Sequence, residues 1–255
     1  MRRRILTTAS SNERFLRQIP LIGEEGQERL ARAKICIAGA GGLGSTIATY
    51  LAAAGVGSFR IIDNDIIEES NLNRQILYRI GDCGERKVDI ATRAIRDLNP
   101  DATVEPVCSF IDAMTVNHLL TGADLVLDGM DNYPARYHLN RACLNLRIPY
   151  LHGAVNGFYG QATSVIPGET ACLRCIIPRP PDKGKVPIIG VTCGVIGSIQ
   201  ATEAIKHITG SHAALAGRLL IWNGVQGDVD SIPTLRSPDC SDCKRYNPMD
   251  EKEEI

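Results

Sequence analysis

Residues 33 to 65, AKICIAGAGGLGSTIATYLAAAGVGSFRIIDND, decide the fold of this chain. An apolar run, Ile35 to Ala38, leads into the glycine-rich turn GAGGLG at 39–44, and an alanine-rich helical pattern follows it. A second apolar run then ends at Asp63. Strand, glycine turn, helix, strand and terminal acid form the order of a nucleotide-binding βαβ unit. This stretch therefore predicts a bound adenine nucleotide.

Each part of the unit has a physical reason. Glycines allow a tight turn and a close approach of the backbone to the ligand. The N-terminus of the helix offers free N–H groups and the positive end of its dipole to phosphate. Asp63, at the end of the second strand, would accept hydrogen bonds from ribose hydroxyls. The alternative is a purely structural glycine turn in an α/β protein, and the motif leaves the chemistry open, with NAD-dependent hydride transfer as the usual one.

The rest of the chain divides near residue 150. The first part alternates strands with helices, which predicts a mostly parallel sheet with right-handed crossovers. Besides the βαβ unit, this part is predicted to contain helices at 23–32, 85–98, 114–120 and 134–146, and strands at 102–110 and 125–128. The second part predicts β structure at 149–166, a proline-rich mobile loop at 176–190, a helix at 194–208 and two strands within 218–235.

We therefore predict one α/β domain over residues 1–255, with a Rossmann-like, mostly parallel sheet and an antiparallel C-terminal extension. The nucleotide-binding part spans about 1–150, and a partner-binding and metal-binding part spans about 151–245. The acidic residues 248–255 are predicted to be a disordered tail.

The composition excludes several classes of protein. With 255 residues, 44% hydrophobic content and a net charge of −1, the chain can bury a core and has no electrostatic footprint for nucleic acid. Its basic start, MRRR, lacks the long apolar segment of a signal peptide, and charges and glycines interrupt every apolar run. We expect a cytoplasmic protein that binds neither nucleic acid nor a membrane.

The nine cysteines contain two Cys-x-x-Cys pairs, Cys172/Cys175 and Cys240/Cys243. Together the pairs can complete a tetrahedral four-sulfur zinc site, and four thiolates leave no open position for catalysis. The predicted metal is therefore structural and would attach the C-terminal segment to the segment before the proline-rich loop. The alternatives are two redox dithiols or unligated buried cysteines. We disfavour the redox interpretation because neither pair is expected to follow a strand and open a helix.

A set of polar residues lies at predicted strand ends and helix starts beside the glycine turn. These residues are Asp63, Asp65, Asn71, Arg74, Gln75, Lys87, Asp128, Asp131 and Asn132. Hydride transfer needs few of them, whereas cleavage of ATP between its α- and β-phosphates needs most. Asp131 is a plausible Mg²⁺ ligand, and Lys87 and Arg74 are plausible clamps on the phosphates. Judged alone, each residue is better explained by an ordinary surface ion pair; their joint placement beside the glycine turn favours the functional interpretation.

These motifs together resemble the MoeB/ThiF/HesA family, the bacterial and archaeal relatives of ubiquitin-activating enzymes. The resemblance covers nearly the whole chain and rests on GAGGLGS, IIDND, SNLNRQ, GERKV, LDGMDNYPARYHLN, CLRC, GSIQATEAIKHITG and SPDC. It implies an adenylyltransferase that binds ATP, Mg²⁺ and structural Zn²⁺. The implied partner is a ubiquitin-like sulfur carrier of the MoaD/ThiS type, whose C-terminal Gly-Gly carboxylate is adenylated with release of pyrophosphate. Such carriers serve molybdopterin, thiamine or tRNA thiolation.

The resemblance also implies roles for individual positions. The nucleotide-binding residues are Gly39, Gly41, Gly42, Gly44, Asp63, Asp65, Asn71, Arg74, Gln75, Lys87, Asp131 and Asn132. The catalytic residues are Arg17, Arg74, Lys87 and Asp131, with Asp131 as the Mg²⁺ ligand. Arg17, which follows Arg14 in RFLRQ, matches an arginine that enters the partner subunit's site in a homodimer. The four paired cysteines match the zinc ligands, and the proline-rich loop matches a segment that crosses the carrier's C-terminal tail.

One departure from the family concerns the loop cysteine that many relatives carry. Residues 176–190 contain none, and Cys193 falls at the predicted start of the following helix. Cys193 is either a thiol for a later thioester or persulfide step or a small packing residue, and we favour packing. Three other functions stay open: adenylation of a small-molecule or peptide carboxylate, an NAD-dependent oxidoreductase with a zinc-bound tail, and a non-enzymatic zinc-bearing scaffold.

Overall fold

The apolar run of the glycine motif is the central strand, β1 (Lys34–Ala38). In the computed structural model, which describes residues 13–180 and 186–246, β1 pairs in parallel with β2 (Ser58–Ile62) and with β4 (Leu125–Asp128). All of β1 except Lys34 is buried, as expected for a parallel strand covered on both faces.

The eight strands form one sheet in the order β3-β2-β1-β4-β5-β6-β7-β8. The strands not yet bounded are β3 (Thr103–Val107), β5 (Tyr150–Asn156), β6 (Tyr159–Val165), β7 (Arg218–Asn223) and β8 (Asp228–Pro233). Pairing is parallel from β3 to β5 and antiparallel from β5 to β8. The predicted fold class, a mostly parallel sheet with an antiparallel C-terminal extension, is confirmed.

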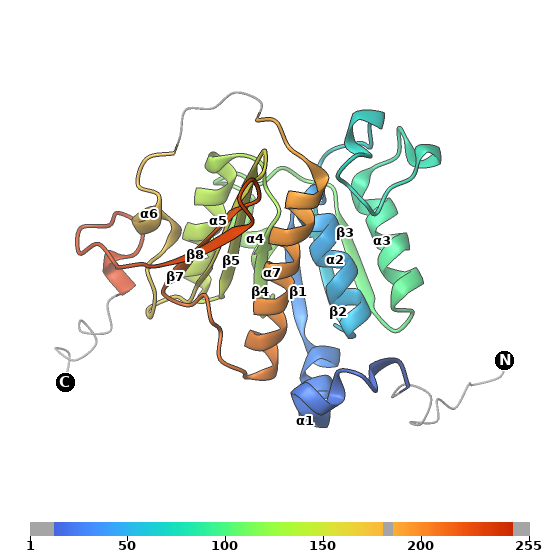
Figure 1. Cartoon of the computed structure of the whole chain (residues 1–255), viewed down its shortest axis with the longest axis horizontal. Coiled ribbons are helices and arrows are strands. Elements are labelled where there is room, and N and C mark those ends of the chain that lie inside the picture. The colour runs from blue at the N-terminus through green and yellow to red at the C-terminus, as the bar shows by residue number, and fades with distance from the viewer. Residues whose placement is uncertain (1–12, 181–185, 247–255) are drawn as a thin grey trace.

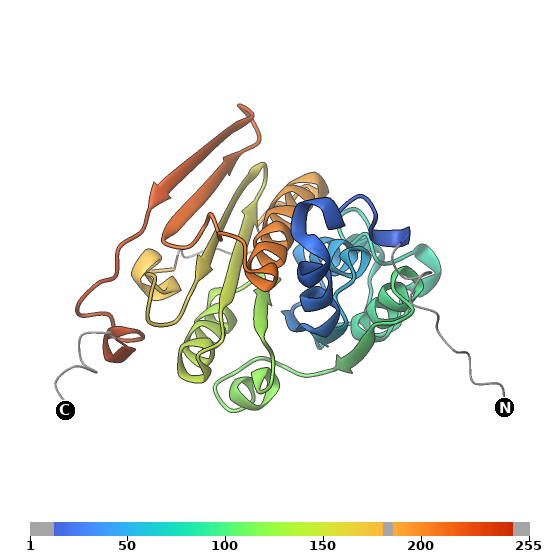
Figure 2. The ribbon, with the colours of Figure 1, turned by 90° about the horizontal axis from the view of Figure 1, so that it is seen from below.

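Helices cover both faces of the sheet (Figures 1 and 2). One face carries α2 (Gly42–Ala54), α3 (Lys87–Leu98) and α7 (Gly190–Thr209), with α1 (Ile19–Arg32) packed on α7. The other face carries α4 (Val116–Leu120) and α5 (Tyr133–Leu146). Alternate residues of β1 enter the two apolar cores, so the period-two pattern of the strand joins both layers. Within the described part of the chain, no helix combines the length and apolar character of a bilayer span.

The short elements are η1 (Glu13–Phe15), η2 (Glu69–Asn71), η3 (Ile80–Asp82), α6 (Leu173–Ile176) and η4 (Lys244–Tyr246). The helix predicted from residue 23 begins earlier, at Ile19, and Gly23 interrupts it with a φ of 74°. Residues 1–12, 181–185 and 247–255 are not described by the structure, so the mobile centre of the proline-rich loop and the disordered acidic tail stay predictions.

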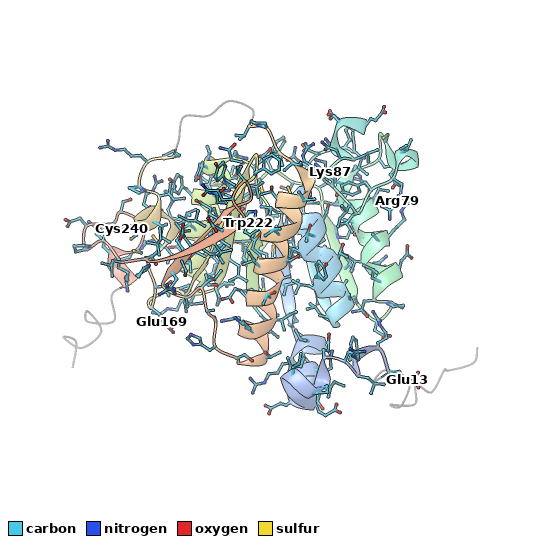
Figure 3. The ribbon with its side chains drawn as sticks, viewed as in Figure 1. Glu13, Arg79, Lys87, Glu169, Trp222 and Cys240 are labelled. Atoms are coloured by element: carbon cyan, nitrogen blue, oxygen red, sulfur yellow. The ribbon has the colours of Figure 1, made fainter. Side chains whose placement is uncertain are left out.

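The carboxyl ends of β1, β2 and β4 meet at one edge of the sheet. Lys87, at the start of α3, lies at this edge, which is the upper one in Figure 3. The segment from η1 to α1 lies at the opposite edge (Figure 1). The fold therefore gathers the polar residues that follow the strands and separates them from the N-terminal segment.

Candidate functional site

The glycine turn after β1 has a shape that only glycine allows at two positions. Gly39 has a φ of 94°, in the left-handed region. A Cβ at Gly44 would lie 1.9 Å from the carbonyl oxygen of Gly39. Helix α2 then begins at Gly42, and no side chain caps its first N–H groups. These groups are therefore available to an anion such as phosphate.

Two side chains hold the turn through Ala40. The Asp63 carboxylate accepts a hydrogen bond from the Ala40 N–H at 2.7 Å, and the Tyr78 hydroxyl donates to the Ala40 carbonyl at 2.7 Å. Burial raises the pKa of Asp63, opposed by hydrogen bonds from the N–H groups of Asp65 and Ala40 and by the charge of Lys87. Asp63, predicted as the ribose acid, thus also shapes the phosphate loop. Tyr78 was missed, because nothing in SNLNRQILY indicates that its hydroxyl returns to the turn.

Lys87 is the buried cation of the site. Its ammonium is 2.8 Å from the carboxylate of Asp65, and only 6% of the lysine side chain is exposed, against 58% for the aspartate. The Lys87 N–H also donates to the Asp65 carbonyl at 3.0 Å. A buried ammonium needs a negative partner. The exposed Asp65 can turn to water when a more highly charged anion, such as a triphosphate, reaches Lys87.

Three more predicted residues lie on the segment that packs beside the glycine turn. Arg74 donates to the Ser70 carbonyl at 2.8 Å and to the Asn73 side chain at 2.9 Å. Gln75 is buried, and its Oε1 has no hydrogen-bond partner among the described residues. Asn71 is also buried, and its carboxamide accepts from the Glu68 N–H at 3.2 Å. Asn71 therefore shapes the segment, while the Gln75 amide nitrogen would lie 3.9 Å from a Cβ placed on Gly41, and the Arg74 backbone carbonyl 3.3 Å from one placed on Gly42.

Asp131 is exposed, three residues beyond β4. Within the described ranges its carboxylate receives one side-chain hydrogen bond, from Asn132 at 3.2 Å. Asn132 is the N-cap of α5, and its Oδ1 accepts from the Ala135 N–H at 3.0 Å. An exposed carboxylate with free lone pairs fits a divalent cation. Asp131 and Asn132 thus lie at the sheet edge that carries the glycine turn, as predicted.

A buried ion pair lies directly behind Asp131. The Asp128 carboxylate accepts from the Tyr150 hydroxyl and from His152 Nδ1, both at 2.7 Å, and is 3.4 Å from Arg136 Nε. Burial raises the pKa of Asp128, but Arg136, His152 and Tyr150 outweigh it and hold the pKa below its ordinary value. The sequence marked Asp128 as an acid that ends a buried strand. The sequence did not identify the partners of Asp128, although Tyr150 and His152, two residues apart on β5, have side chains on the same face of the sheet.

Cys193 lies in the first turn of α7, as predicted, and is buried. A Cβ placed on Gly42 would lie 2.7 Å from its sulfur, so the thiol packs against the glycine turn. Burial raises the pKa of the Cys193 thiol, opposed by the charge of Arg74. A raised pKa lowers the fraction of nucleophilic thiolate, which supports the packing interpretation.

The four paired cysteines meet far from Lys87, on the side of the molecule where Figure 3 labels Cys240. All four sulfur atoms lie within 4.8 Å of one another, with Cys172–Cys240 at 3.7 Å and Cys175–Cys243 at 3.4 Å. Zn–S bonds of about 2.3 Å in a tetrahedron place sulfurs about 3.8 Å apart. The cluster therefore fits Zn²⁺. Cys172 is the N-cap of the four-residue α6, but six residues separate it from the end of β6, so this pair does not open a helix directly after a strand.

Asn140 of α5 joins the two cysteine pairs. It is fully buried, its Oδ1 accepts from the Leu173 N–H at 2.9 Å, and its Nδ2 donates to Asp242 at 3.2 Å. Leu173 lies inside the first pair and Asp242 inside the second. The helix that starts beside Asp131 thus also connects the two halves of the four-cysteine cluster.

The proline-rich segment leaves the metal centre and returns beside the β5–β6 hairpin. After the undescribed residues 181–185, the Pro187 carbonyl accepts from the Gly157 N–H at 2.7 Å. The Thr192 hydroxyl donates to the Gly157 carbonyl at 2.9 Å. These contacts fix the return of the segment at the hairpin turn and lead it into α7, above the nucleotide edge of the sheet (Figure 1).

Arg14 and Arg17 do not join the site of their own chain. Arg14 donates to Asn99 at 3.4 Å and to the Leu98 carbonyl, so it packs on the end of α3. Arg17 is exposed between η1 and α1. Figure 1 shows this segment at the end of the sheet opposite the one that carries the start of α3. The predicted nucleotide-binding residues thus follow β1, β2 and β4 along the chain, and Arg17, which was predicted to enter a partner subunit's site, stays a prediction.

Comparison with known proteins adds a family match and several relatives. The chain matches the ThiF family over residues 15–243. It is 41% identical over 243 residues to the SAMP-activating enzyme E1 of Haloferax volcanii, covering 92% of this chain and 90% of that protein. It is 38% identical over 249 residues to the sulfur carrier protein adenylyltransferase of Thermus thermophilus, covering 92% of each.

Longer relatives and solved structures also match. The adenylyltransferase and sulfurtransferase MOCS3 of Drosophila yakuba is 40% identical over 240 residues, which are 90% of this chain and 53% of that protein. The crystal structure of E. coli MccB with ATP has a TM-score of 0.83 at 24% identity, covering 91% of this chain and 75% of that one. At this identity the structural match supports the fold alone.

Proposed function

Because the chain belongs to the ThiF family, we propose that it is an adenylyltransferase that activates the C-terminal Gly-Gly carboxylate of a ubiquitin-like sulfur carrier. Two relatives that span over 90% of this chain are named for activating such carriers. The observation that carries the proposal is the meeting of the uncapped α2 N-terminus, buried Lys87 and exposed Asp131 at one sheet edge. That edge suits a triphosphate better than a nicotinamide.

The reaction needs little acid–base chemistry. A carboxylate is already ionised and nucleophilic at neutral pH, so it attacks the α-phosphorus of ATP without a general base. The new bond joins a carrier oxygen to that phosphorus, and the bond to the β-phosphate oxygen breaks with release of pyrophosphate. The enzyme therefore has to orient the two reactants and neutralise charge.

Each part of the site has a role in that task. The N–H groups at the start of α2 and the ammonium of Lys87 bind the phosphates, Arg74 adds charge, and Asp63 holds the ribose. Asp131 would hold Mg²⁺, which when bound neutralises charge on the phosphates. The proline-rich segment between α6 and α7 would cross over the carrier tail. The four-cysteine cluster would hold Zn²⁺ as a structural ion.

Arg17 enters the proposal only through a second copy of the chain. It lies at the sheet edge opposite its own nucleotide site, so we propose a homodimer in which it reaches the partner's site. Mixing inactive Arg17→Ala with inactive Lys87→Ala protein tests this arrangement. Random exchange should make half of the dimers mixed, each with one intact site, and restore about a quarter of the wild-type activity. No recovery, with exchange verified, would contradict it.

Pyrophosphate exchange into ATP tests the reaction itself, since it detects reversible adenylate formation. Wild-type protein should catalyse exchange only when a carrier ending in Gly-Gly is present. Asp131→Ala should lose it, while Asp124→Ala, at the opposite end of β4, should keep it. Exchange with small carboxylic acids and none with any carrier would replace the carrier with a small-molecule acceptor.

A further inference from the structure

The two oxygens of the Asp128 carboxylate serve different partners. Oδ2 receives the hydrogen bonds of Tyr150 and His152 and faces the guanidinium of Arg136. Oδ1 accepts from the Met130 N–H at 2.9 Å. One side of the carboxylate is therefore fixed by the core, and the other side holds the loop that leaves β4.

Arg136 holds the same loop from the other side. It projects from α5, is buried, and donates from one nitrogen, Nη2, to the Met130 carbonyl at 2.5 Å and to the Gly153 carbonyl at 3.2 Å. Both backbone polar atoms of Met130 are thus bound, one by each member of the buried ion pair. Met130 immediately precedes Asp131.

The surroundings keep the pair in one arrangement. Burial lowers the pKa of His152, so the ring is neutral and its Nδ1–H donates to the ionised Asp128. His152 Nε2 then accepts from the Gln161 amide at 3.1 Å. Gln200 donates to the Asp128 carbonyl at 2.9 Å. Replacing a buried ion pair with hydrophobic residues often leaves a protein core equally stable. Stability alone therefore does not explain why the Asp128–Arg136 pair is present.

We propose that the buried Asp128–Arg136 pair is a positioning device for Asp131: by holding both backbone polar atoms of Met130, it fixes the loop from which the metal-binding carboxylate projects. The proposal rests on the function above, in which Asp131 holds the magnesium of bound ATP. Catalytic groups displaced by about 1 Å lose large factors in activity, so a rigid support for this loop has a functional value.

Three variants separate positioning from stability. Arg136→Lys keeps a positive charge near Asp128, but one ammonium cannot also reproduce the contacts to Met130 and Gly153. Asp128→Asn keeps an acceptor for the Met130 N–H but places an uncharged amide nitrogen toward Arg136, which loses the partner that holds it; it is the second test, should the lysine variant not fold. Tyr150→Phe is the matched control, because it removes a buried hydrogen bond to Asp128 and leaves the Met130 contacts in place.

The experiment measures the affinity of the full chain for a non-cleavable ATP analogue by calorimetry, with and without magnesium. The dissociation constant without magnesium divided by the one with magnesium reports the contribution of the metal to affinity. Thermal unfolding of each variant reports stability. We expect Arg136→Lys or Asp128→Asn to reduce that ratio about tenfold, with metal-free affinity unchanged, and Tyr150→Phe to keep it.

Two results would overturn the proposal: an unchanged ratio in folded Arg136→Lys or Asp128→Asn protein, or an equal fall in Tyr150→Phe at matched stability. Failure of the proposed function has another signature. Wild-type protein without pyrophosphate exchange would reject adenylation itself, whereas exchange in wild type together with an unchanged ratio in the variants would reject only the positioning role.

Discussion

Lys87 is the residue whose environment best indicates a bound polyanion. Its ammonium is almost fully buried, and its partner, Asp65, is mostly exposed. Lys87→Ala should lower pyrophosphate exchange about 100- to 1,000-fold, since it removes a buried charge aimed at the phosphates. Lys34→Ala, which changes an exposed lysine at the start of β1, is the control. A Lys87→Ala rate within a factor of two of wild type would exclude this role.

His152 makes folding sensitive to pH. Burial lowers its pKa below the ordinary 6.5, with Asp128 opposing and Arg136 reinforcing the shift. The unfolded chain therefore binds more protons below about pH 6.5, and the free energy of unfolding should fall between pH 7 and pH 5. His207 has a lowered pKa for the same reason and adds to the slope.

The variant His152→Asn separates the two histidines. It keeps a donor near the Nδ1 position and cannot titrate, so its stability should fall less steeply between pH 7 and pH 5 in urea unfolding. His212→Asn, at an exposed histidine, should follow the wild type. Equal slopes in His152→Asn and wild-type protein would show that His152 does not contribute.

Among single residues, the sequence predicted the polar residues that follow strands. It missed the buried residues whose hydrogen bonds hold the neighbouring loops in place. Lys87 and Asp131 were found because chain order places them beside the glycine turn. Tyr78 and His152 were missed, because the hydroxyl of Tyr78 meets Ala40 and the ring of His152 meets Asp128, contacts 38 and 24 residues apart in sequence. Local patterns do not report such contacts, and only the packed sheet creates them.

Two helical glycines, Gly44 in α2 and Gly194 in α7, form a matched pair. Gly44→Ala would place a methyl group 1.9 Å from the Gly39 carbonyl oxygen, so the phosphate turn would have to move. Gly194→Ala lies in helix α7 with no atom within 4 Å of the added carbon. We expect Gly44→Ala to abolish ATP binding in calorimetry. Gly194→Ala should keep binding and gain about 0.5–1 kcal/mol of stability. Equal binding by both variants would contradict the role of the turn.

Most elements were predictable because their apolar periodicity is strong. The strand predicted at 125–128 is β4, and the helix predicted at 85–98 is α3, which starts two residues later. The kink of α1 at Gly23 and the short α6 were not predicted. Both depend on tertiary contacts: α1 packs on α7, and α6 is set by the cysteine cluster and Asn140.

At the scale of the molecule, the four-cysteine cluster and the end of the sheet that carries the glycine turn lie apart, on the sides labelled by Cys240 and Lys87 in Figure 3. Stripping the four-cysteine cluster with a zinc-selective chelator, followed by a return to excess magnesium, should therefore lower the melting temperature and expose residues 234–246 to protease, while ATP affinity in magnesium stays within about threefold. Cys240→Ser should behave in the same way without chelator. Full loss of ATP binding on chelation would show that the two regions fold as one unit.

The central claim is that this sheet edge joins AMP to a carboxylate. Intact-mass spectrometry of a Gly-Gly carrier, after incubation with the wild-type chain, ATP and magnesium, tests it most directly. We predict release of pyrophosphate and a gain of one AMP unit at the carrier's C-terminus, absent when the terminal glycines are removed. Conversion of ATP to ADP and phosphate with every carrier mass unchanged would contradict the claim.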